Sequence, residues 1–266
     1  IFKMQKSFSL LLLASASYAA STPYISGQVT STEQFLYGKF RAQVTGPGTK
    51  GSCVGFFTEW TGPDYDYLWW NSVEMELVPS LDTTPLSIDL SYGDGIDRRQ
   101  AQSYDPSFQS GSDAHIYEFT WTPNEVTFSA DGQTLKTFQK GDPYVDNQSK
   151  HQNIMFNMWA PRWDAHDEDW SKGRDDSTMP WFAKADWIEY YSWDGETDAF
   201  NYEWRDEFDS LETSKWTVAH EFGFDVNLST YMNTQVYAEE GQLVLKLEKN
   251  NQSVLSHSNE SSTFLQ

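Results

Sequence analysis

The chain of 266 residues carries 39 acidic and 18 basic side chains, which gives a formal net charge of −21. This excess of negative charge disfavours nucleic acid, whose phosphates bind basic patches, and equally disfavours anionic membranes and polyanionic substrates. Aromatic residues make up 16% of the chain, with 12 Trp and 14 Tyr. Trp and Tyr offer flat faces with polar edges. Together with the negative charge, they indicate a soluble, secreted protein that acts on a neutral polymer. We expect a monomer.

The first twenty residues have the pattern of a secretory signal. Lys3 and Lys6 form a short basic region, residues 8–16 (FSLLLLASA) form an apolar run, and residues 17–20 (SYAA) supply small residues for cleavage. The apolar run is too short to cross a bilayer. We therefore predict a signal region at 1–20 and an extracellular protein.

Short segments with alternating or continuous apolar residues follow, separated by Gly, Pro and Asp turn signals. Asp131-Gly132 is a strong signal for a β-hairpin. No amphipathic helix of useful length is evident, so the pattern predicts an all-β sandwich or jelly roll. One such domain spans 21–250, and the Ser- and Asn-rich tail at 251–266 is expected to be disordered. The predicted strands are 34–44, 53–60, 72–78, 86–92, 115–121, 125–130, 133–138, 154–159, 185–193 and 243–247.

The stretch from Trp69 to Val78 (WWNSVEMELV) is the most informative in the chain. Its period of two predicts a strand with Ser72, Glu74 and Glu76 on one face. Like charges on one face cost stability unless something uses them. Two carboxylates beside two Trp residues are the usual equipment for cleaving glycosidic bonds. On this stretch alone, a solvated strand face is an equally good interpretation.

Two other features carry less information about function. Cys53 is the sole cysteine, so no intramolecular disulfide forms, and a small buried strand residue is the expected role. A polar cluster downstream has metal-binding residue types, but its spacing fits no recognised site, so we interpret it as a solvated loop. That cluster consists of Asp164, His166, Asp167, Glu168 and Asp169.

Several segments resemble glycoside hydrolase family 16, the β-jelly-roll group of lichenases, laminarinases and related endo-glucanases. The sequence around the acidic strand lies where that family has the pattern W-x-E-[IV]-D-[IV]-E. The resemblance covers nearly all of residues 26–250 and implies a concanavalin A-like jelly roll. The matching segments are 26–29, 37–42, 56–57 with 61–63, 70–77, 115–123, 157–159 and 187–191.

The order of the matching segments is shifted relative to most of the family. Segments similar to the usual start of the family stand at the end of this chain, at 204–216 and 240–247. The chain therefore looks circularly permuted, with residues 194–201 as the join. Permutation is tolerated where the two termini lie close together at the surface, and a licheninase with this order of segments is known in the family.

The family motif implies roles for the three polar residues of the acidic strand. Its first Glu is the nucleophile, its Asp assists, and its last Glu is the general acid/base. By this correspondence Glu76 is the acid/base, Glu74 takes the assisting position, and Ser72 occupies the nucleophile position. A serine hydroxyl cannot supply the charge that stabilises an oxocarbenium-like transition state, and no base flanks it in sequence.

Three explanations of Ser72 stay open: an engineered change, a natural variant that lost hydrolysis and kept sugar binding, or transfer of the nucleophile role to Glu74. The favoured function is a secreted endo-β-glucanase that hydrolyses β-1,3-1,4-glucan with retention. The alternative is a non-catalytic β-glucan-binding protein on the same fold. A structural or adhesion domain is a third, less supported interpretation.

The resemblance also implies substrate-binding positions and a structural Ca²⁺, with no cofactor for catalysis. Each substrate-binding position has a structural alternative, and His115 in particular is more often a structural histidine. The Ca²⁺ ligands would be the Asp186 carboxylate and the backbone carbonyls of Gly51 and Glu207, all hard oxygens. The implied substrate-binding residues are Tyr37, Trp69, Trp70, Asp89, His115, Asn157 and Trp159.

Overall fold

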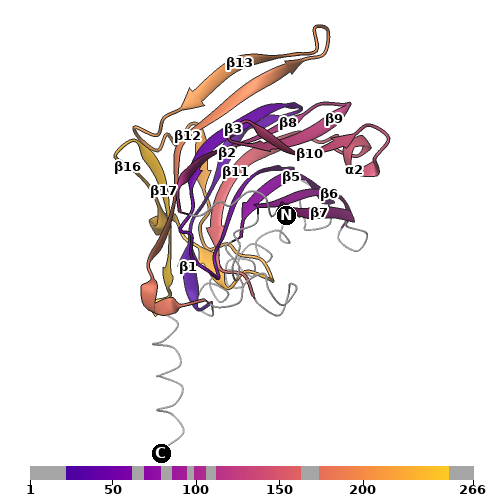
Figure 1. The fold of residues 1–266 in the computed structure, drawn as a ribbon. Helices are drawn as coiled ribbons and strands as arrows, with labels where there is room; N and C mark the ends of the chain where they lie inside the picture. The colour runs from indigo at the N-terminus through magenta and orange to yellow at the C-terminus, as the bar shows by residue number, and fades with distance from the viewer. Residues whose placement is uncertain are drawn as a thin grey trace, which may run out of the picture.

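Two curved β-sheets are stacked face to face in the computed structural model, which describes residues 22–61, 69–78, 86–94, 99–105, 112–162 and 174–251 (Figure 1). The predicted all-β jelly-roll sandwich is confirmed. The predicted signal region and nearly all of the predicted disordered tail lie outside the described residues. Within the described ranges, no helix is long and apolar enough to cross a membrane.

The larger sheet has ten strands and forms the outer layer of the curve (Figure 1). Its main path runs β10-β9-β8-β3-β12-β17-β1-β15, with β13 paired to β12 and β16 paired to β17. The strands are β1 (Tyr24–Ser26), β3 (Gly38–Thr45), β8 (Ala114–Trp121), β9 (Glu125–Ala130), β10 (Gln133–Gln139), β12 (Trp181–Asp194), β13 (Ala199–Asp206), β15 (Ser229–Tyr231), β16 (Val236–Glu239) and β17 (Gln242–Lys249).

The smaller sheet has seven strands in the order β14-β2-β11-β4-β5-β6-β7 and lies on the inner side of the curve (Figure 1). Helical structure in the described residues is limited to three short turns: α2 (Pro143–Asp146), η1 (Asp176–Thr178) and η2 (Asn233–Gln235). The strands are β2 (Gln28–Phe35), β4 (Cys53–Glu59), β5 (Trp69–Leu77), β6 (Leu86–Asp94), β7 (Arg99–Asp105), β11 (Gln152–Trp159) and β14 (Trp216–Val218).

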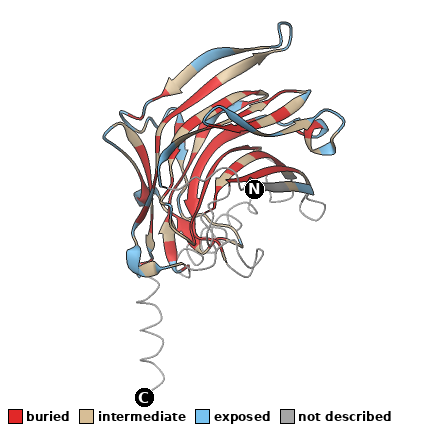
Figure 2. Ribbon diagram, in the orientation of Figure 1, coloured by how far each residue is buried: buried red, intermediate tan, exposed pale blue. Residues whose placement is uncertain are grey.

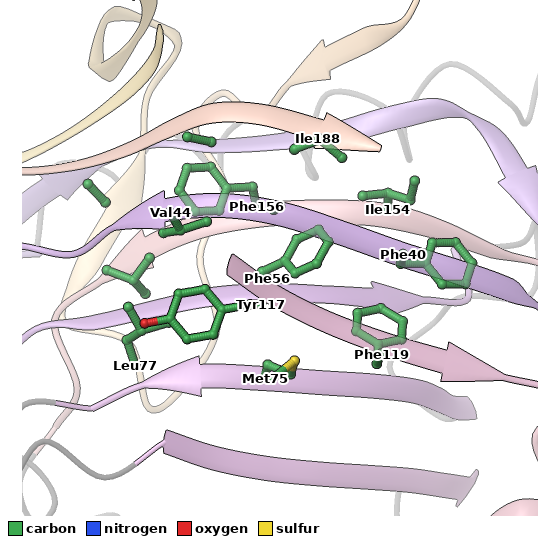
Figure 3. Close-up of a cluster of buried hydrophobic side chains, with 14 of the residues drawn as sticks. Phe40, Val44, Phe56, Met75, Leu77, Tyr117, Phe119, Ile154, Phe156 and Ile188 are labelled. Atoms are coloured by element: carbon green, nitrogen blue, oxygen red, sulfur yellow. The ribbon is translucent and has the colours of Figure 1, made fainter. Parts of the chain in front are cut away.

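The hydrophobic core fills the space between the two sheets, where buried positions dominate both layers (Figure 2). Met75 and Leu77 of β5 lie opposite Tyr117 and Phe119 of β8 (Figure 3). Val73 is also buried in this core. Since alternate residues of a strand point to opposite faces, Ser72, Glu74 and Glu76 point away from the core, as predicted.

Two turns show how local sequence sets the strand boundaries. Asp131 and Gly132 have φ of 49° and 78° and join β9 to β10, which confirms the predicted hairpin. The predicted continuous strand at 34–44 is wrong, because the chain turns at Tyr37 (φ 65°) and Gly38 (φ 143°). At Gly38 an added Cβ would lie 2.6 Å from the Tyr191 carbonyl oxygen, so only glycine fits. This turn carries the chain from one sheet to the other.

The two ends of the described chain lie side by side. Tyr24 and Ile25 of β1 pair with Lys249 and Glu248 of β17. Beyond the strands, the Asn250 side chain donates a hydrogen bond of 3.0 Å to the Thr22 carbonyl. The predicted proximity of the C-terminal strand and the N-terminal part of the domain is confirmed. A permuted order requires this proximity, and the permutation itself stays a prediction.

Because these ends touch, a chain that joins Asn250 to Thr22 and opens in the β12–β13 turn at 195–198 should keep the fold. A linker of about four to six residues is sufficient for a surface connection. We expect an unchanged far-UV circular dichroism spectrum and a Tm lowered by no more than about 4 °C, the shift that ~1 kcal/mol causes in a domain of this size.

The matched control joins the same ends but opens the chain inside β5, between Glu74 and Met75. That variant should lose cooperative thermal unfolding, because β5 pairs on both sides with β4 and β6. Loss of cooperative unfolding in the variant opened at 195–198 would contradict the prediction that the fold is kept when the chain is joined at its present ends and opened in this turn.

Candidate active site

The candidate site lies on the carboxylate face, the side of the seven-stranded sheet that carries Ser72, Glu74 and Glu76. The antiparallel registers of β4, β5 and β6 arrange their side chains on this face in rows across the sheet. The first row is Glu59–Ser72–Ser91, the second is Phe57–Glu74–Asp89, and the third is Gly55–Glu76–Ser87. Directly opposed side chains have Cβ atoms about 5 Å apart.

Four carboxylates therefore share a small area of one sheet face. They occupy all three rows: Glu59 in the first, Glu74 with Asp89 in the second, and Glu76 in the third. Carboxylates so close repel one another unless donors or a substrate compensate. Paired acidic groups on one face are the arrangement that cleavage of a glycosidic bond requires.

Ser72 is fully buried and held from two sides. Its hydroxyl donates a hydrogen bond to the Glu74 carboxylate. Its carbonyl accepts a 3.1 Å hydrogen bond from the Gln148 side chain, which also donates at 2.8 Å to the Ser91 carbonyl. Gln148 thus ties β5 to β6 at the level of the nucleophile position, and Ser72 acts there as a donor to its neighbour.

Asp89, predicted to contact glucose hydroxyls, lies directly opposite Glu74 and is 1% exposed. Ser91 donates a hydrogen bond of 2.8 Å to one of its oxygens, and the Gln100 side chain donates to the other. These donors favour the ionised carboxylate. Asp89 and Glu74 face each other at the centre of the carboxylate face, and each accepts a hydrogen bond from a serine hydroxyl.

Glu76 lies beside a glycine whose open side is occupied by Asn157. Its partner on β4 is Gly55, and a Cβ there would lie 2.7 Å from the Asn157 side-chain oxygen. That oxygen accepts a hydrogen bond of 3.1 Å from the Gly55 amide, so Asn157 is fixed beside Glu76. The Cys53 thiol lies 3.5 Å from a Glu76 carboxylate oxygen and donates to it.

The predicted aromatic residues differ in their surroundings. Trp70 is partly exposed, lies on the carboxylate face and is paired with Gly93, which leaves room beside the ring. Trp159 is 4% exposed and packs edge-on against Phe224 at 5.1 Å. Trp159 therefore contributes packing here, and sugar stacking by it stays a prediction. The Trp69 side chain lies outside the described residues.

Tyr37 and His115 are not placed with the carboxylates, which corrects the expectation that both line the substrate site. Tyr37 sits in the β2–β3 turn and contacts the rings of Trp121 and Trp193. His115 belongs to the outer sheet, and its Nδ1 lies 2.7 Å from the Asp131 carboxylate at the β9–β10 turn. Its alternation with buried Tyr117 places it on the inter-sheet side of β8.

Two of the three predicted Ca²⁺ ligands lie near the same turn. Asp186 accepts a hydrogen bond from Gln242, and the Glu207 carbonyl lies next to Gly241, 3.9 Å from the position of a Cβ there. These two ligands therefore lie near the β16–β17 turn. Within the described ranges, no group of three or more His, Cys, Asp or Glu side chains is arranged to hold a metal.

Gly51, the third predicted ligand, stays a prediction. It packs against Arg174, whose guanidinium lies 4.8 Å from the ring of Tyr24. Tyr24 pairs with Lys249 at the opposite end of β17, about 23 Å from Gln242 at 3.3 Å per residue. Arg174 and Tyr24 thus lie between Gly51 and that end of β17.

Sequence analysis missed several residues of the site. Glu59, Ser91 and Gln100 reach the carboxylate face only through cross-strand pairing, which no local pattern reveals. The alternation of β4 is masked because all seven of its residues are buried. The acidic cluster at 164–169 lies outside the described residues.

Comparisons with known proteins agree with this site. The sequence profile described as glycosyl hydrolases family 16 matches residues 2–189. A β-glucanase of Fibrobacter succinogenes is 26% identical over 255 residues, covering 92% of this chain and 71% of that protein. A β-glucanase of Acetivibrio thermocellus is 26% identical over 182 residues, covering 68% of this chain and 50% of that protein.

Solved structures are similar in fold. LamAcat from Zobellia galactanivorans has a TM-score of 0.51 at 13% identity, covering 62% of this chain and 68% of that one. A Bacteroides ovatus GH16 protein, solved with a G4G4G3G product, has a TM-score of 0.50 at 17% identity, covering 61% and 79%. At these identities the likeness shows a shared fold.

The Cys53 thiol should be unreactive in the folded protein. Its side chain is fully buried, and burial, followed by the negative charge of Glu76, raises the thiol pKa well above its usual value. Since the thiolate is the reactive form, a thiol reagent at pH 8 should label the native protein only at its rate of unfolding.

Denatured protein should take up one equivalent of the reagent at once, which serves as the control. Rapid labelling of the native protein would contradict the enclosed position of Cys53 beside Glu76.

Proposed function

The chain belongs to glycosyl hydrolase family 16, and on that premise we propose that it is an endo-acting β-glucanase with an incomplete nucleophile position. The observation that carries the proposal is the set of carboxylates on one sheet face, with Glu74 and Glu76 two positions apart beside Trp70. The two relatives named β-glucanase support the substrate class. The order of segments favours a mixed-linkage β-1,3-1,4-glucan.

Glu76 is assigned as the general acid/base. As a carboxylic acid it would protonate the oxygen of the leaving sugar. Its neighbours across the sheet are Gly55 and, on the next strand, Asn157, and the Cys53 thiol donates a hydrogen bond to one of its oxygens. This contact orients the carboxyl group.

Glu74 takes the assisting position, and Ser72 leaves the nucleophile position without a carboxylate. In a retaining enzyme the second carboxylate attacks the sugar carbon and forms a covalent intermediate. The Ser72 hydroxyl donates a hydrogen bond to the Glu74 carboxylate. Because this carboxylate is negatively charged, it favours the neutral hydroxyl of Ser72 over an alkoxide. Hydrolysis by the retaining route should therefore be slow in this chain.

A second candidate function is a β-glucan-binding protein without catalysis. Ser72 favours it, because the remaining carboxylates and Trp70 can bind sugar hydroxyls and faces without cleaving a bond. Both functions share one substrate class, a neutral polysaccharide, which suits the net charge of −21. We propose an extracellular location for either function, based on the signal pattern at residues 1–20.

Restoring the carboxylate through Ser72→Glu should bring back retaining endo-hydrolysis. We expect a rise in kcat/KM of at least ~1000-fold, equivalent to about 4 kcal/mol of barrier. The measurement is a reducing-sugar assay on barley-type glucan and on laminarin. Adding Glu76→Gln to Ser72→Glu should remove the gained activity and serves as the matched control.

Binding of mixed-linkage oligosaccharides, measured by calorimetry, separates the two candidate functions. If Ser72→Glu stays inactive while the oligosaccharides bind, the binding-protein interpretation holds and the enzyme proposal is wrong. Rapid retaining hydrolysis by the unaltered chain would instead assign the nucleophile to Glu74.

We also propose that Asp186, with the Glu207 carbonyl, contributes to a structural Ca²⁺ site near the β16–β17 turn. Their hard oxygens suit Ca²⁺. A chelator should lower the Tm, and Ca²⁺ at about 100 times its Kd should restore about 2.7 kcal/mol of stability. Asp186→Asn should remove this dependence on Ca²⁺. A Tm of the unaltered chain that does not respond to chelator would refute the site.

A further inference from the structure

We propose that a pocket at the edge of the sandwich binds one glucose ring of a β-glucan chain, as a second binding site apart from the carboxylate face. This inference rests on the proposed function for the class of its ligand, a neutral β-glucan. The observation that carries it is a pocket of about 220 Å³ between β2 and β14 of the smaller sheet and β13 of the larger one. Its lining includes Glu33, Phe35, Trp204, Ser214, Lys215 and Trp216.

Aromatic rings form the apolar part of this edge pocket. The Trp204 ring centroid lies 6.2 Å from that of Phe35 and 6.4 Å from that of Trp216. Both neighbours are buried, whereas Trp204 is partly exposed. Their contacts hold the indole in place before any ligand binds, which lowers the entropic cost of binding. A fixed aromatic face suits the apolar C–H face of a sugar ring.

Two polar groups of the lining have unused hydrogen-bonding capacity. In the part of the chain that the structure describes, no residue accepts a hydrogen bond from the Trp204 indole N–H or donates one to the Glu33 carboxylate. The indole of Trp216 differs, because its Nε1 donates to the Asp206 carboxylate at 2.9 Å. A donor and an acceptor beside an aromatic face are the groups that orient a ligand with several hydroxyls.

The charges and the size of the pocket favour a neutral sugar ring. The Glu33 carboxylate disfavours an anionic ligand, and the Lys215 ammonium disfavours a cationic one. Lys215 Nζ is itself balanced by carboxylate oxygens of Glu212 at 3.5 Å and Asp206 at 3.8 Å. The volume lies below the range of about 300–1,000 Å³ that is usual for ligand pockets. One sugar ring therefore fits better than an oligosaccharide.

The β2 segment of the pocket lies level with the first row of the carboxylate face. Gln34, next to Glu33, pairs with Asn153, which pairs with Glu59 opposite Ser72. Because β2 and β5 are three strand spacings apart, they are separated by about 14 Å across the sheet. A glucan polymer is long enough to contact both sites. Two linked contacts strengthen the binding of a polymer more than either contact does alone.

The first test is a titration of nitrogen-15-labelled protein with methyl β-D-glucoside, followed through the indole N–H resonances by NMR. The Trp204 resonance, assigned by its loss in Trp204→Phe, should shift in a saturable way. Glu33→Gln should weaken this binding ~10-fold, the usual effect of losing a hydrogen bond to a charged group. Glu196→Gln is the matched control, because Glu196 is also exposed but lies in the β12–β13 turn, and it should leave the titration unchanged.

The second test is retention of the protein in native gels that contain barley glucan. Ser214→Arg places a large side chain at the pocket, and it should spare the fold because Ser214 is exposed and binds Thr32 through its carbonyl. We expect the dissociation constant for the polymer to rise at least ~10-fold, since one of two linked contacts is lost. An unchanged Tm of this variant shows that the fold is kept.

A Trp204 resonance that does not move, or retention that is absent or that Ser214→Arg leaves unchanged, would overturn the pocket site and leave the proposed function intact. A stronger shift with choline than with the glucoside would also overturn it, because the ligand would then be a cation on the aromatic rings. Failure of the proposed function is seen separately, as the absence of oligosaccharide binding and hydrolysis in the Ser72→Glu form.

Discussion

The antiparallel register of β4, β5 and β6 is the constraint on which the site depends. Packing of Val73, Met75 and Leu77 between the sheets fixes which residues of β5 face outward, and a slip of one residue would exchange the two faces. Cross-strand pairing then selects the neighbours, so that Glu59, Asp89 and Gly55 stand opposite Ser72, Glu74 and Glu76 respectively. The position of every acidic group thus follows from apolar packing on the reverse side of the sheet.

The same constraint explains how the chain tolerates a serine at the nucleophile position. A strand keeps its register when one outward side chain is shortened, because the register is set by the core and by Gln148, which bonds to the Ser72 and Ser91 carbonyls. Glu74 gains a donor in the Ser72 hydroxyl, which offsets part of its repulsion with Asp89. The face still carries four carboxylates, those of Glu59, Glu74, Glu76 and Asp89.

Sequence predicted the parts of the molecule that local pattern determines. The alternation at 72–77 predicted the two faces of β5, and Asp131-Gly132 predicted the β9–β10 hairpin. Tertiary pairing decided the rest. Glu59 lies in a strand that is buried on both faces, so no alternation in the sequence predicts which way its side chain points. The turn at Tyr37 lies among apolar residues, so no local signal predicts it. His115 alternates like a residue of the site, yet it faces the inter-sheet space. Gly51 was assigned to Ca²⁺ by resemblance, while the chain places it beside Arg174.

The central claim is that the β-glucan is bound on the carboxylate face, with Glu76 at the scissile bond. A crystal structure of the protein with a mixed-linkage tetrasaccharide tests it most directly. The account predicts sugar rings across β4, β5 and β6, with the Glu76 carboxyl group at the glycosidic oxygen. An oligosaccharide bound on the outer face of the ten-stranded sheet, or one that leaves Glu76 without contact to sugar, would contradict it.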